Sequence, residues 1–117
     1  MHEMSLVRSV VDIVLEHAKK TQAREVRAVH LVIGEGRDVV QDYMDGLFKF
    51  LARDTVAARA DLVIRTTPLT VRCNRCGHVF PIDFARPETW VCPECAAPRD
   101  YKLNSGMEFV IDSIECR

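Results

Sequence analysis

The sequence predicts an α+β fold, in which a three-stranded sheet and two helices are interrupted by a small inserted subdomain. Two segments have apolar residues at helical spacing, three have strand-like alternation, and four cysteines precede the last predicted strand. The length of 117 residues suits one core with a small appendage. The composition is 48% hydrophobic with a net charge of -1, so it lacks the basic excess typical of nucleic-acid binding.

The first predicted helix runs from about Met4 to Lys20. Its apolar stripe consists of Leu6, Val10, Ile13 and Val14, and His17 continues it. Ser5 is expected to cap the start of the helix through its hydroxyl, and lysines suit its negative end. Because His17 lies on the stripe, we interpret it as a partly buried, hydrogen-bonded residue rather than a metal ligand.

Three segments are expected to be strands: 25–33, 60–67 and 107–116. In the first, Val29, Leu31 and Ile33 lie on one face and Val26, Ala28, His30 and Val32 on the other. His30, on the first strand, receives the same interpretation as His17. Pro68 ends the second strand because it cannot donate to a ladder.

The second predicted helix follows the first strand and runs to about Arg53. Asp38 is expected to cap its start, after a break at residues 34–36. Gly46 lies inside this helix at a cost of about 1 kcal/mol relative to alanine. Packing of the apolar stripe must outweigh that cost, or the glycine allows close approach of another helix.

The strongest motif is a pair of CxxC sequences, Cys73-Asn74-Arg75-Cys76 and Cys92-Pro93-Glu94-Cys95, separated by 15 residues. This spacing is typical of a four-thiolate zinc site, in which each CxxC forms a tight turn and both turns face one tetrahedral ion. Two disulfides would require an oxidising compartment and a redox dithiol needs only one CxxC, so both alternatives are disfavoured. Four cysteines fill the coordination of zinc, so this zinc ribbon is expected to be structural.

The inserted zinc-ribbon domain is predicted to comprise residues 69–105, and the α+β domain residues 1–68 and 106–117. The chain crossings, near Leu69 to Arg72 and Lys102 to Gly106, are expected to act as a hinge. A ribbon this small cannot bury an adequate core alone, so removing its metal is expected to unfold it while the α+β domain stays folded.

The start of the chain offers a second set of metal ligands. The Met1 amine, the His2 imidazole, the Glu3 carboxylate and the backbone amides lie within reach of one small ion. Such a nitrogen-rich set suits Ni²⁺ or Cu²⁺ in square-planar geometry. The alternative is a terminal segment with no ligand role, and the residues alone leave both interpretations open.

The remaining motifs favour neither catalysis nor a polyanionic partner. His78 is interpreted as a turn residue or a donor near the zinc ligands, and Cys116 as a small apolar residue that exposure would permit to form an oxidative dimer. No serine lies in a GxSxG-like setting and there is no phosphate-binding glycine loop, so no enzyme is predicted. A nucleic-acid module would use Arg72, Arg75, Arg86 and Arg99, which acidic residues balance. A purely structural interaction protein is a third class.

The amino-terminal sequence has no basic segment followed by a long apolar run, and no stretch approaches the length of a membrane span. The protein is therefore expected to be cytoplasmic, with reduced cysteines.

The motifs in combination resemble the hydrogenase and urease nickel-incorporation proteins, nickel metallochaperones of the HypA type. The residues that carry the resemblance are Met1-His2-Glu3-Met4-Ser5-Leu6 opening a helix, a strand ending in Ile33-Gly34-Glu35, a second helix, and two CxxC pairs before a final strand. The resemblance covers essentially the whole chain. After Gly34, Glu-Gly-Arg-Asp-Val-Val replaces a common Ala-Leu-Ser-Gly-Val pattern, and the chain is similar to the form in which an Asp-Val pair opens the second helix.

The resemblance implies a nickel site formed by His2 with Glu3 and the backbone from Met1, and a structural zinc held by Cys73, Cys76, Cys92 and Cys95. It also implies a nickel-binding GTPase of the hydrogenase maturation pathway as partner. Delivery is expected to the large subunit of a [NiFe] hydrogenase, or to urease accessory proteins, with neither nucleic acid nor a membrane as partner.

Overall fold

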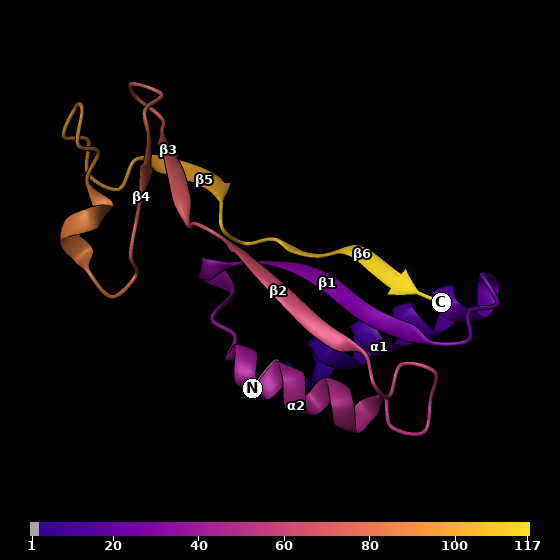
Figure 1. Ribbon diagram of the computed structural model, residues 1–117. Helices are drawn as coiled ribbons and strands as arrows, with labels where there is room; N and C mark the ends of the chain where they lie inside the picture. The colour runs from indigo at the N-terminus through magenta and orange to yellow at the C-terminus, as the bar shows by residue number, and fades with distance from the viewer. Residues whose placement is uncertain (1–2) are drawn as a thin grey trace. The chain divides into compact units, whose positions relative to one another are not determined.

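The computed structural model describes residues 3–117, which form two α-helices and two three-stranded sheets (Figure 1). The α-helices and strands, in order, are α1 Glu3–Lys20, β1 Val26–Gly34, α2 Gln41–Leu51, β2 Asp61–Thr67, β3 Thr70–Cys73, β4 Val79–Pro81, β5 Tyr101–Ser105 and β6 Phe109–Cys116. Short 3-10 helices occupy Glu35–Arg37 and Pro87–Trp90. The sheets have the orders β2-β1-β6 and β4-β3-β5. The α+β class is confirmed, and the second sheet adds three strands to the three expected.

The chain divides into two compact units. The first contains the residues up to Val32, Asp38–Arg65 and Val110–Arg117, and the second contains Ile33–Arg37 and Thr66–Phe109. The short segment Ile33–Arg37 therefore belongs to the second unit, which contains the four cysteines and is called the ribbon unit below, although the segment connects β1 to α2.

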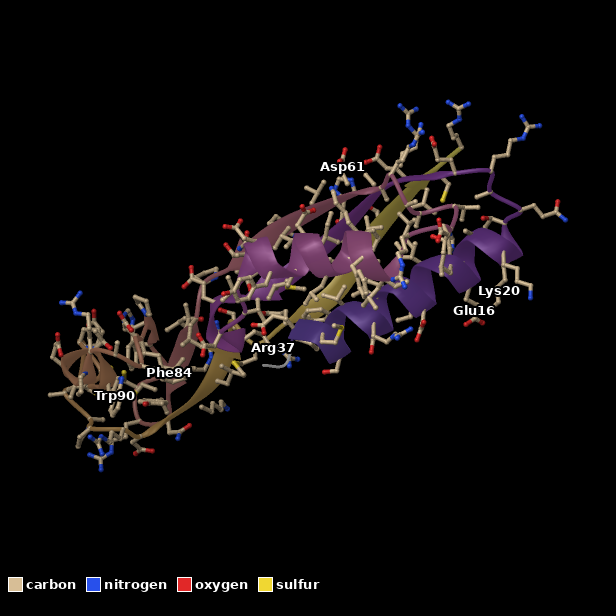
Figure 2. All side chains as sticks on the ribbon, turned by 90° about the horizontal axis from the view of Figure 1, so that it is seen from below. Glu16, Lys20, Arg37, Asp61, Phe84 and Trp90 are labelled. Carbon is tan, nitrogen blue, oxygen red and sulfur yellow. The ribbon has the colours of Figure 1, made fainter. Side chains whose placement is uncertain are left out.

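Helix α1 buries one apolar stripe, formed by Val7, Val10, Val11, Val14 and Ala18. The predicted stripe was partly wrong: Ile13 is 54% exposed and His17 is exposed. The Ser5 cap was also wrong, because the helix already begins at Glu3 and Ser5 lies inside it. On the outer face, Glu16 and Lys20 form an ion pair one turn apart, with 3.3 Å between carboxylate and ammonium (Figure 2).

Helix α2 begins later than expected. Val40 precedes its first residue in an extended conformation, with no side-chain cap, and Asp38 has a left-handed φ of 54° rather than an N-cap geometry. The predicted cap at Asp38 was therefore wrong. Gly46 does not permit a close helix approach in this chain, because an added Cβ would meet no atom within 4 Å.

The core of the first unit lies between the sheet and the two helices, which cover the same side of it (Figure 1). Strand β1 is central, and most of its side chains are buried. From α2, Met44 and Phe48 are fully buried, and α1 packs against α2. An apolar central strand with two amphipathic helices therefore closes this core.

The second unit is built on antiparallel pairing of β3 with β4 and β5. Its register places Val71 opposite Phe80 on one side and opposite Leu103 on the other. The core residues are Leu69, Val71, Cys73, Phe80, Ile82, Cys92 and Ala97, with Trp90 and Tyr101 packed against them. Residues 70–73 and 101–105, which overlap the two predicted crossings, pair with each other as strands β3 and β5 within this unit. The hinge expected there stays a prediction.

The turn at Gly106 holds the segment after β1 close to the ribbon. Gly106 has φ +109°, which favours glycine, and its carbonyl accepts from the Gly36 amide at 2.7 Å. The Glu108 carboxylate accepts from the Thr67 hydroxyl at 2.7 Å and from the Gly106 amide at 2.8 Å. Gly34 approaches so closely that an added Cβ would lie 2.0 Å from the Gly106 carbonyl carbon.

Candidate metal centres

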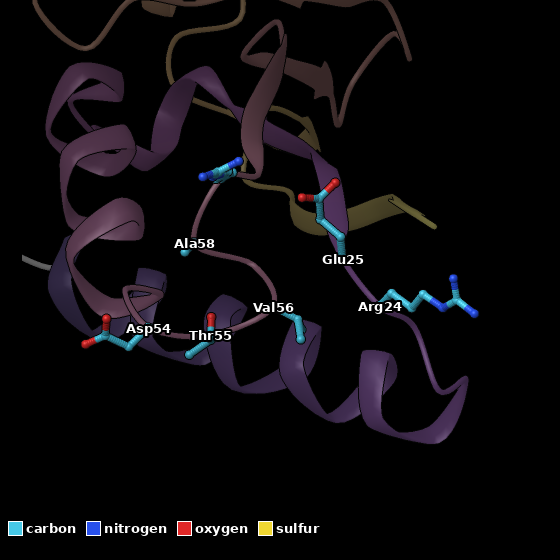
Figure 3. A pocket seen from close by; sticks show the side chains of 7 residues that line it. Arg24, Glu25, Asp54, Thr55, Val56 and Ala58 are labelled. Carbon is cyan, nitrogen blue, oxygen red and sulfur yellow. The ribbon is translucent and has the colours of Figure 1, made fainter.

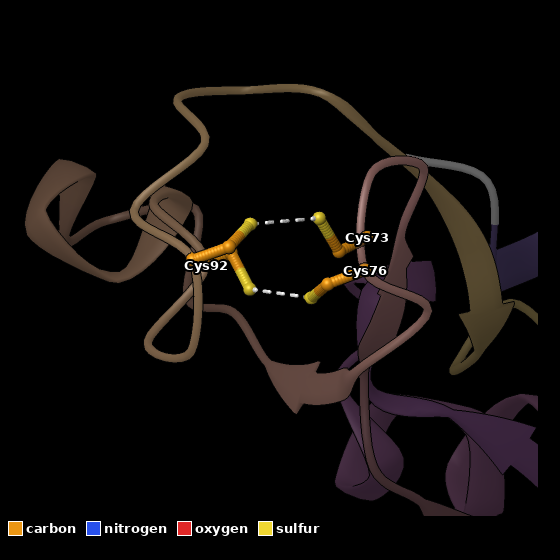
Figure 4. Close-up of side chains that lie close together, drawn as sticks. Cys73, Cys76 and Cys92 are labelled. Carbon is orange, nitrogen blue, oxygen red and sulfur yellow. Dashed lines mark hydrogen bonds between the residues drawn. The ribbon is translucent and has the colours of Figure 1, made fainter.

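The four predicted cysteines come together at the end of the ribbon (Figure 4). All four sulfurs lie within 4.8 Å of one another. Cys73 Sγ is 3.6 Å from Cys95 Sγ, and Cys76 Sγ is 3.5 Å from Cys92 Sγ. Each close pair joins one CxxC turn to the other, so the two turns face each other as the spacing predicted.

Backbone hydrogen bonds shape each turn. In the first, the Gly77 amide donates to the Cys73 carbonyl at 3.0 Å, and Gly77 has φ +77°. In the second, the Ala96 amide donates to the Cys92 carbonyl at 2.9 Å, and Ala96 has φ +61°. Both turns thus close through a residue in the left-handed region, which glycine accepts freely and alanine accepts at a steric cost.

The sulfur positions fit a zinc ion. Tetrahedral zinc with Zn–S bonds of about 2.3 Å requires sulfurs about 3.8 Å apart. A disulfide requires about 2 Å between sulfurs, and all five cysteines are free. The geometry therefore favours a four-thiolate metal site over the disulfide alternative.

The thiols of this cluster differ in their affinity for protons. A hydrogen bond from the Cys76 amide is the main cause that lowers the pKa of Cys73 to about 7. At Cys76, the His78 amide lowers the pKa, but desolvation and the neighbouring sulfurs outweigh it and raise the pKa to about 12. Four such close sulfurs cannot all ionise unaided because their charges repel, whereas a divalent cation stabilises the thiolates.

The histidines near the cysteines and on the sheet have other contacts. The ring of His78 stacks on Phe80 with centroids 6.3 Å apart, and its carbonyl accepts from the Cys73 amide, as expected of a turn residue. His30 is half-buried and pairs with Glu115, which confirms the interpretation made from sequence. Cys116 is partly buried and free.

The amino-terminal candidate site is described only from Glu3 onward, because Met1 and His2 lie outside the described residues. Glu3 begins α1 and is only 7% exposed. Its carboxylate accepts a hydrogen bond from the Val40 amide at 3.3 Å, which joins the first turn of α1 to the start of α2. Sequence reasoning missed this role because the two residues are far apart along the chain.

Two surface hollows in the first unit were not predicted. One, of about 550 Å³, lies beside Glu3 between the helices and is lined by Met4, Asp42, Tyr43, Gly46 and Leu47 as well. The other, of about 490 Å³, contains Arg24, Glu25, Asp54 and Arg59 among its lining residues (Figure 3). The two arginines and two acids that line this second hollow balance in charge.

The ribbon arginines considered for nucleic-acid binding are engaged in other contacts. Their partners are the Gly77 carbonyl for Arg72, Asp100 for Arg75, Glu88 for Arg86 and the Trp90 ring for Arg99. Two of the four positive charges are thus paired with carboxylates. Among the described residues, no helix is both long and apolar enough to cross a membrane.

Comparison with known proteins agrees with the two motifs. The family described as hydrogenase/urease nickel incorporation, metallochaperone, hypA, matches residues 1–116. The hydrogenase maturation factor HypA of Dehalococcoides mccartyi is 37% identical over 115 residues, covering 98% of this chain and 93% of the relative. That of Chlorobaculum parvum is 37% identical over 114 residues, covering 97% of each chain.

Solved structures agree with the fold. The solution structure of the Ni metallochaperone HypA from Helicobacter pylori has a TM-score of 0.65 and 27% identity, covering 99% of this chain and 97% of that one. A solution structure of HypA protein has a TM-score of 0.73 and 29% identity, covering 100% and 97%. The chain therefore belongs to the HypA family of hydrogenase and urease nickel-incorporation metallochaperones, which are maturation factors and not enzymes.

Proposed function

We propose that this chain binds Ni²⁺ at its amino terminus, through His2, Glu3 and the backbone from Met1, and delivers it during maturation of [NiFe] hydrogenase. The observation that carries the proposal is the family match over residues 1–116, which includes the Met-His-Glu start. An imidazole, an amine and backbone amides suit Ni²⁺ in square-planar geometry. A site at a chain end is also readily dismantled by a competing acceptor, as delivery requires.

Glu3 supports this proposal electrostatically. The first turn of a helix carries a positive partial charge, which opposes a cation. Glu3 is the first residue of α1, and its carboxylate places a negative charge in that turn. The same carboxylate accepts from the amide of Val40, the residue just before α2, which fixes its position.

We also propose that Cys73, Cys76, Cys92 and Cys95 hold a structural zinc. Four thiolates leave no coordination position for substrate or water, so the ion would supply folding energy rather than chemistry. On this basis residues 69–105 form a zinc-ribbon domain, and residues 1–68 and 106–117 form the nickel-binding domain.

The partners follow from the same proposal. A nickel-binding GTPase of the hydrogenase maturation pathway would act with this chain, and the large subunit of the hydrogenase would receive the metal. The family description also includes urease, so urease accessory proteins are an alternative destination. The reduced cysteines suit action in the cytoplasm.

Calorimetry of Ni²⁺ binding to the zinc-loaded chain tests the nickel site. His2→Ala should abolish tight binding, while His17→Ala, an exposed histidine farther along α1, should retain it. Affinity should fall between neutral and mildly acid pH, because the imidazole and the terminal amine protonate with ordinary pKa values of about 6.5 and about 8. Equal nickel affinity in His2→Ala and the parent chain, or an affinity unchanged by acid, would reject the proposed site.

Delivery needs a separate measurement. In cells that lack their own copy of this factor, the parent chain should restore hydrogenase activity and His2→Ala should not. Restoration by His2→Ala would show that the chain acts in maturation without carrying nickel there.

A further inference from the structure

Asp100, the residue immediately before β5, contacts the first CxxC turn through both its backbone and its side chain. Its carbonyl accepts from the Asn74 amide at 2.9 Å. Its two carboxylate oxygens accept from Asn74 Nδ2 and Arg75 Nε, each at 3.0 Å. Asp100 therefore accepts three hydrogen bonds, which come from the two residues between Cys73 and Cys76.

The charge of Asp100 agrees with these contacts. Hydrogen bonds from the Asn74 and Arg75 side chains hold the pKa of its carboxyl below the ordinary value, so the group is ionised at neutral pH. Strand pairing places Cys73 opposite Tyr101, the next residue after Asp100. The pairing of β3 with β5, which holds Cys73, therefore also places the Asp100 carboxylate beside the turn.

The second CxxC turn has no equivalent support among the described residues. No side chain in residues 3–117 bonds to Pro93 or Glu94, and the turn is closed by backbone bonds between Cys92 and residues 96–97. Ala96 and Arg99, which flank its exit, both have positive φ without being glycine. One turn is therefore clamped by a carboxylate, whereas the other is held by backbone bonds alone, among them the Val91–Pro98 bridge and the Arg99 amide on the Trp90 carbonyl.

We propose that Asp100 is a positioning residue for the four-cysteine site, which holds the Cys73–Cys76 turn in its metal-binding conformation, so that metal loss begins at the Cys92–Cys95 turn. This inference rests on the zinc proposed above. Groups that orient metal ligands commonly change metal affinity by about 10- to 100-fold when removed. The Arg75–Asp100 pair is well exposed to solvent, so we expect the lower end of that range.

Release of zinc to an excess of a chromophoric chelator, measured on the full-length chain, tests the role of Asp100. Asp100→Ala should accelerate release about 10-fold, and Asp100→Asn, which keeps an acceptor for Asn74 but not the charge, should give an intermediate rate. Glu88→Ala is the matched control, because it removes another exposed arginine–carboxylate pair of the ribbon, with Arg86 Nε 3.1 Å from Glu88 Oε1. That variant should release zinc at the parent rate.

The order of release provides a readout that general destabilisation would not reproduce. Cys76 and Cys95 are both exposed, so their alkylation by N-ethylmaleimide during partial chelation can be compared directly by mass spectrometry. In the parent chain, Cys95 should be labelled before Cys76, and in Asp100→Ala the two should be labelled together. Simultaneous labelling in the parent chain would overturn the proposal.

Milder variants keep the proposal testable if Asp100→Ala folds poorly. Asn74→Ala and Arg75→Gln should each accelerate zinc release. Adding Asp100→Asn to the variant that carries both substitutions should have little further effect, because the three side chains act as one unit. Equal zinc release rates in every variant would overturn the role of Asp100 and leave the proposed zinc site standing. A parent chain that binds no zinc would instead overturn the proposed zinc site, and the inference with it.

Discussion

Replacing Gly34 by alanine should lower the free energy of unfolding, because the added Cβ would clash with the backbone at residues 106–107. The new Cβ would lie 2.0 Å from the Gly106 carbonyl carbon and 2.5 Å from the Met107 amide nitrogen. These are backbone atoms, so no rotamer change can relieve the clash. Overpacking of this kind costs about 1–3 kcal/mol.

Separation of the two segments would also weaken neighbouring hydrogen bonds. The Gly34 amide donates to the Glu108 carbonyl at 2.8 Å, and the Gly36 amide donates to the Gly106 carbonyl at 2.7 Å. A backbone hydrogen bond contributes about 1 kcal/mol net. We therefore expect a total loss of about 3 kcal/mol in the free energy of unfolding, which is large beside a typical stability of about 5–15 kcal/mol.

Urea denaturation of the zinc-loaded chain measures this loss. Trp90 is the only tryptophan and packs against the ribbon core, so its fluorescence reports on the unit that contains Gly34. Gly46→Ala is the control, because an added Cβ there meets nothing and a helical alanine gains about 1 kcal/mol over glycine. A Gly34→Ala midpoint equal to that of the parent chain would refute the close-approach argument.

Three further predictions concern the core, the metal and acid. Phe48→Ala should lower the free energy of unfolding by about 3–5 kcal/mol, because Phe48 is fully buried. Phe50→Ala should lower it far less, because Phe50 is 55% exposed. Urea denaturation of both variants measures the difference. Chelation of zinc should leave the far-UV circular dichroism of α1 and α2 largely intact, since both helices lie in the other unit, and loss of most helical signal would contradict this. Glu108 has its pKa lowered, chiefly by the Thr67 hydroxyl, so the stability it contributes is present above its ordinary pKa of 4.5 and is lost as pH falls below that value. Thr67→Val should raise that pKa in an NMR titration of the carboxyl carbon, and an unchanged value would dismiss the hydrogen bond as its cause.

The main elements of the fold could be predicted because local pattern and packing agree for them. Strand β1 is apolar at nearly every position and becomes the buried centre of its sheet. The cysteine spacing likewise predicted the facing turns, since each CxxC can close on its own backbone. Such features depend mainly on residues close together in sequence.

The buried face of α1 could not be chosen from sequence alone. Leu6 and Val7, Val10 and Val11, and Ile13 and Val14 are adjacent apolar pairs, so two stripes rotated by about 100° both fit helical spacing. Packing selected the stripe that contains Val7 and Val11, and left Ile13 exposed. The pattern defined the helix, but contacts across the fold defined its orientation.

The ribbon sheet was missed for a different reason. Strands β3 and β4 have only four and three residues, too few to show a period. They form because the first CxxC turn reverses the chain and pairs Arg72 with Val79. The contacts of Asp100 with Asn74 and Arg75 were equally invisible, since they join residues 25 and 26 positions apart.

The two proposed metals require opposite properties of their sites. A structural zinc needs a closed set of ligands that resists exchange, and the four sulfurs, with one turn clamped by Asp100, provide that closure. A cargo ion needs ligands that a partner can displace, and residues beside a chain terminus satisfy that need. At one of the points where the chain passes between the two units, the Gly36 amide is bonded to Gly106 in the second unit, and the Val40 amide is bonded to Glu3 in the first. Only four positions along the chain therefore separate a residue fixed by the ribbon from one that fixes the first turn of α1.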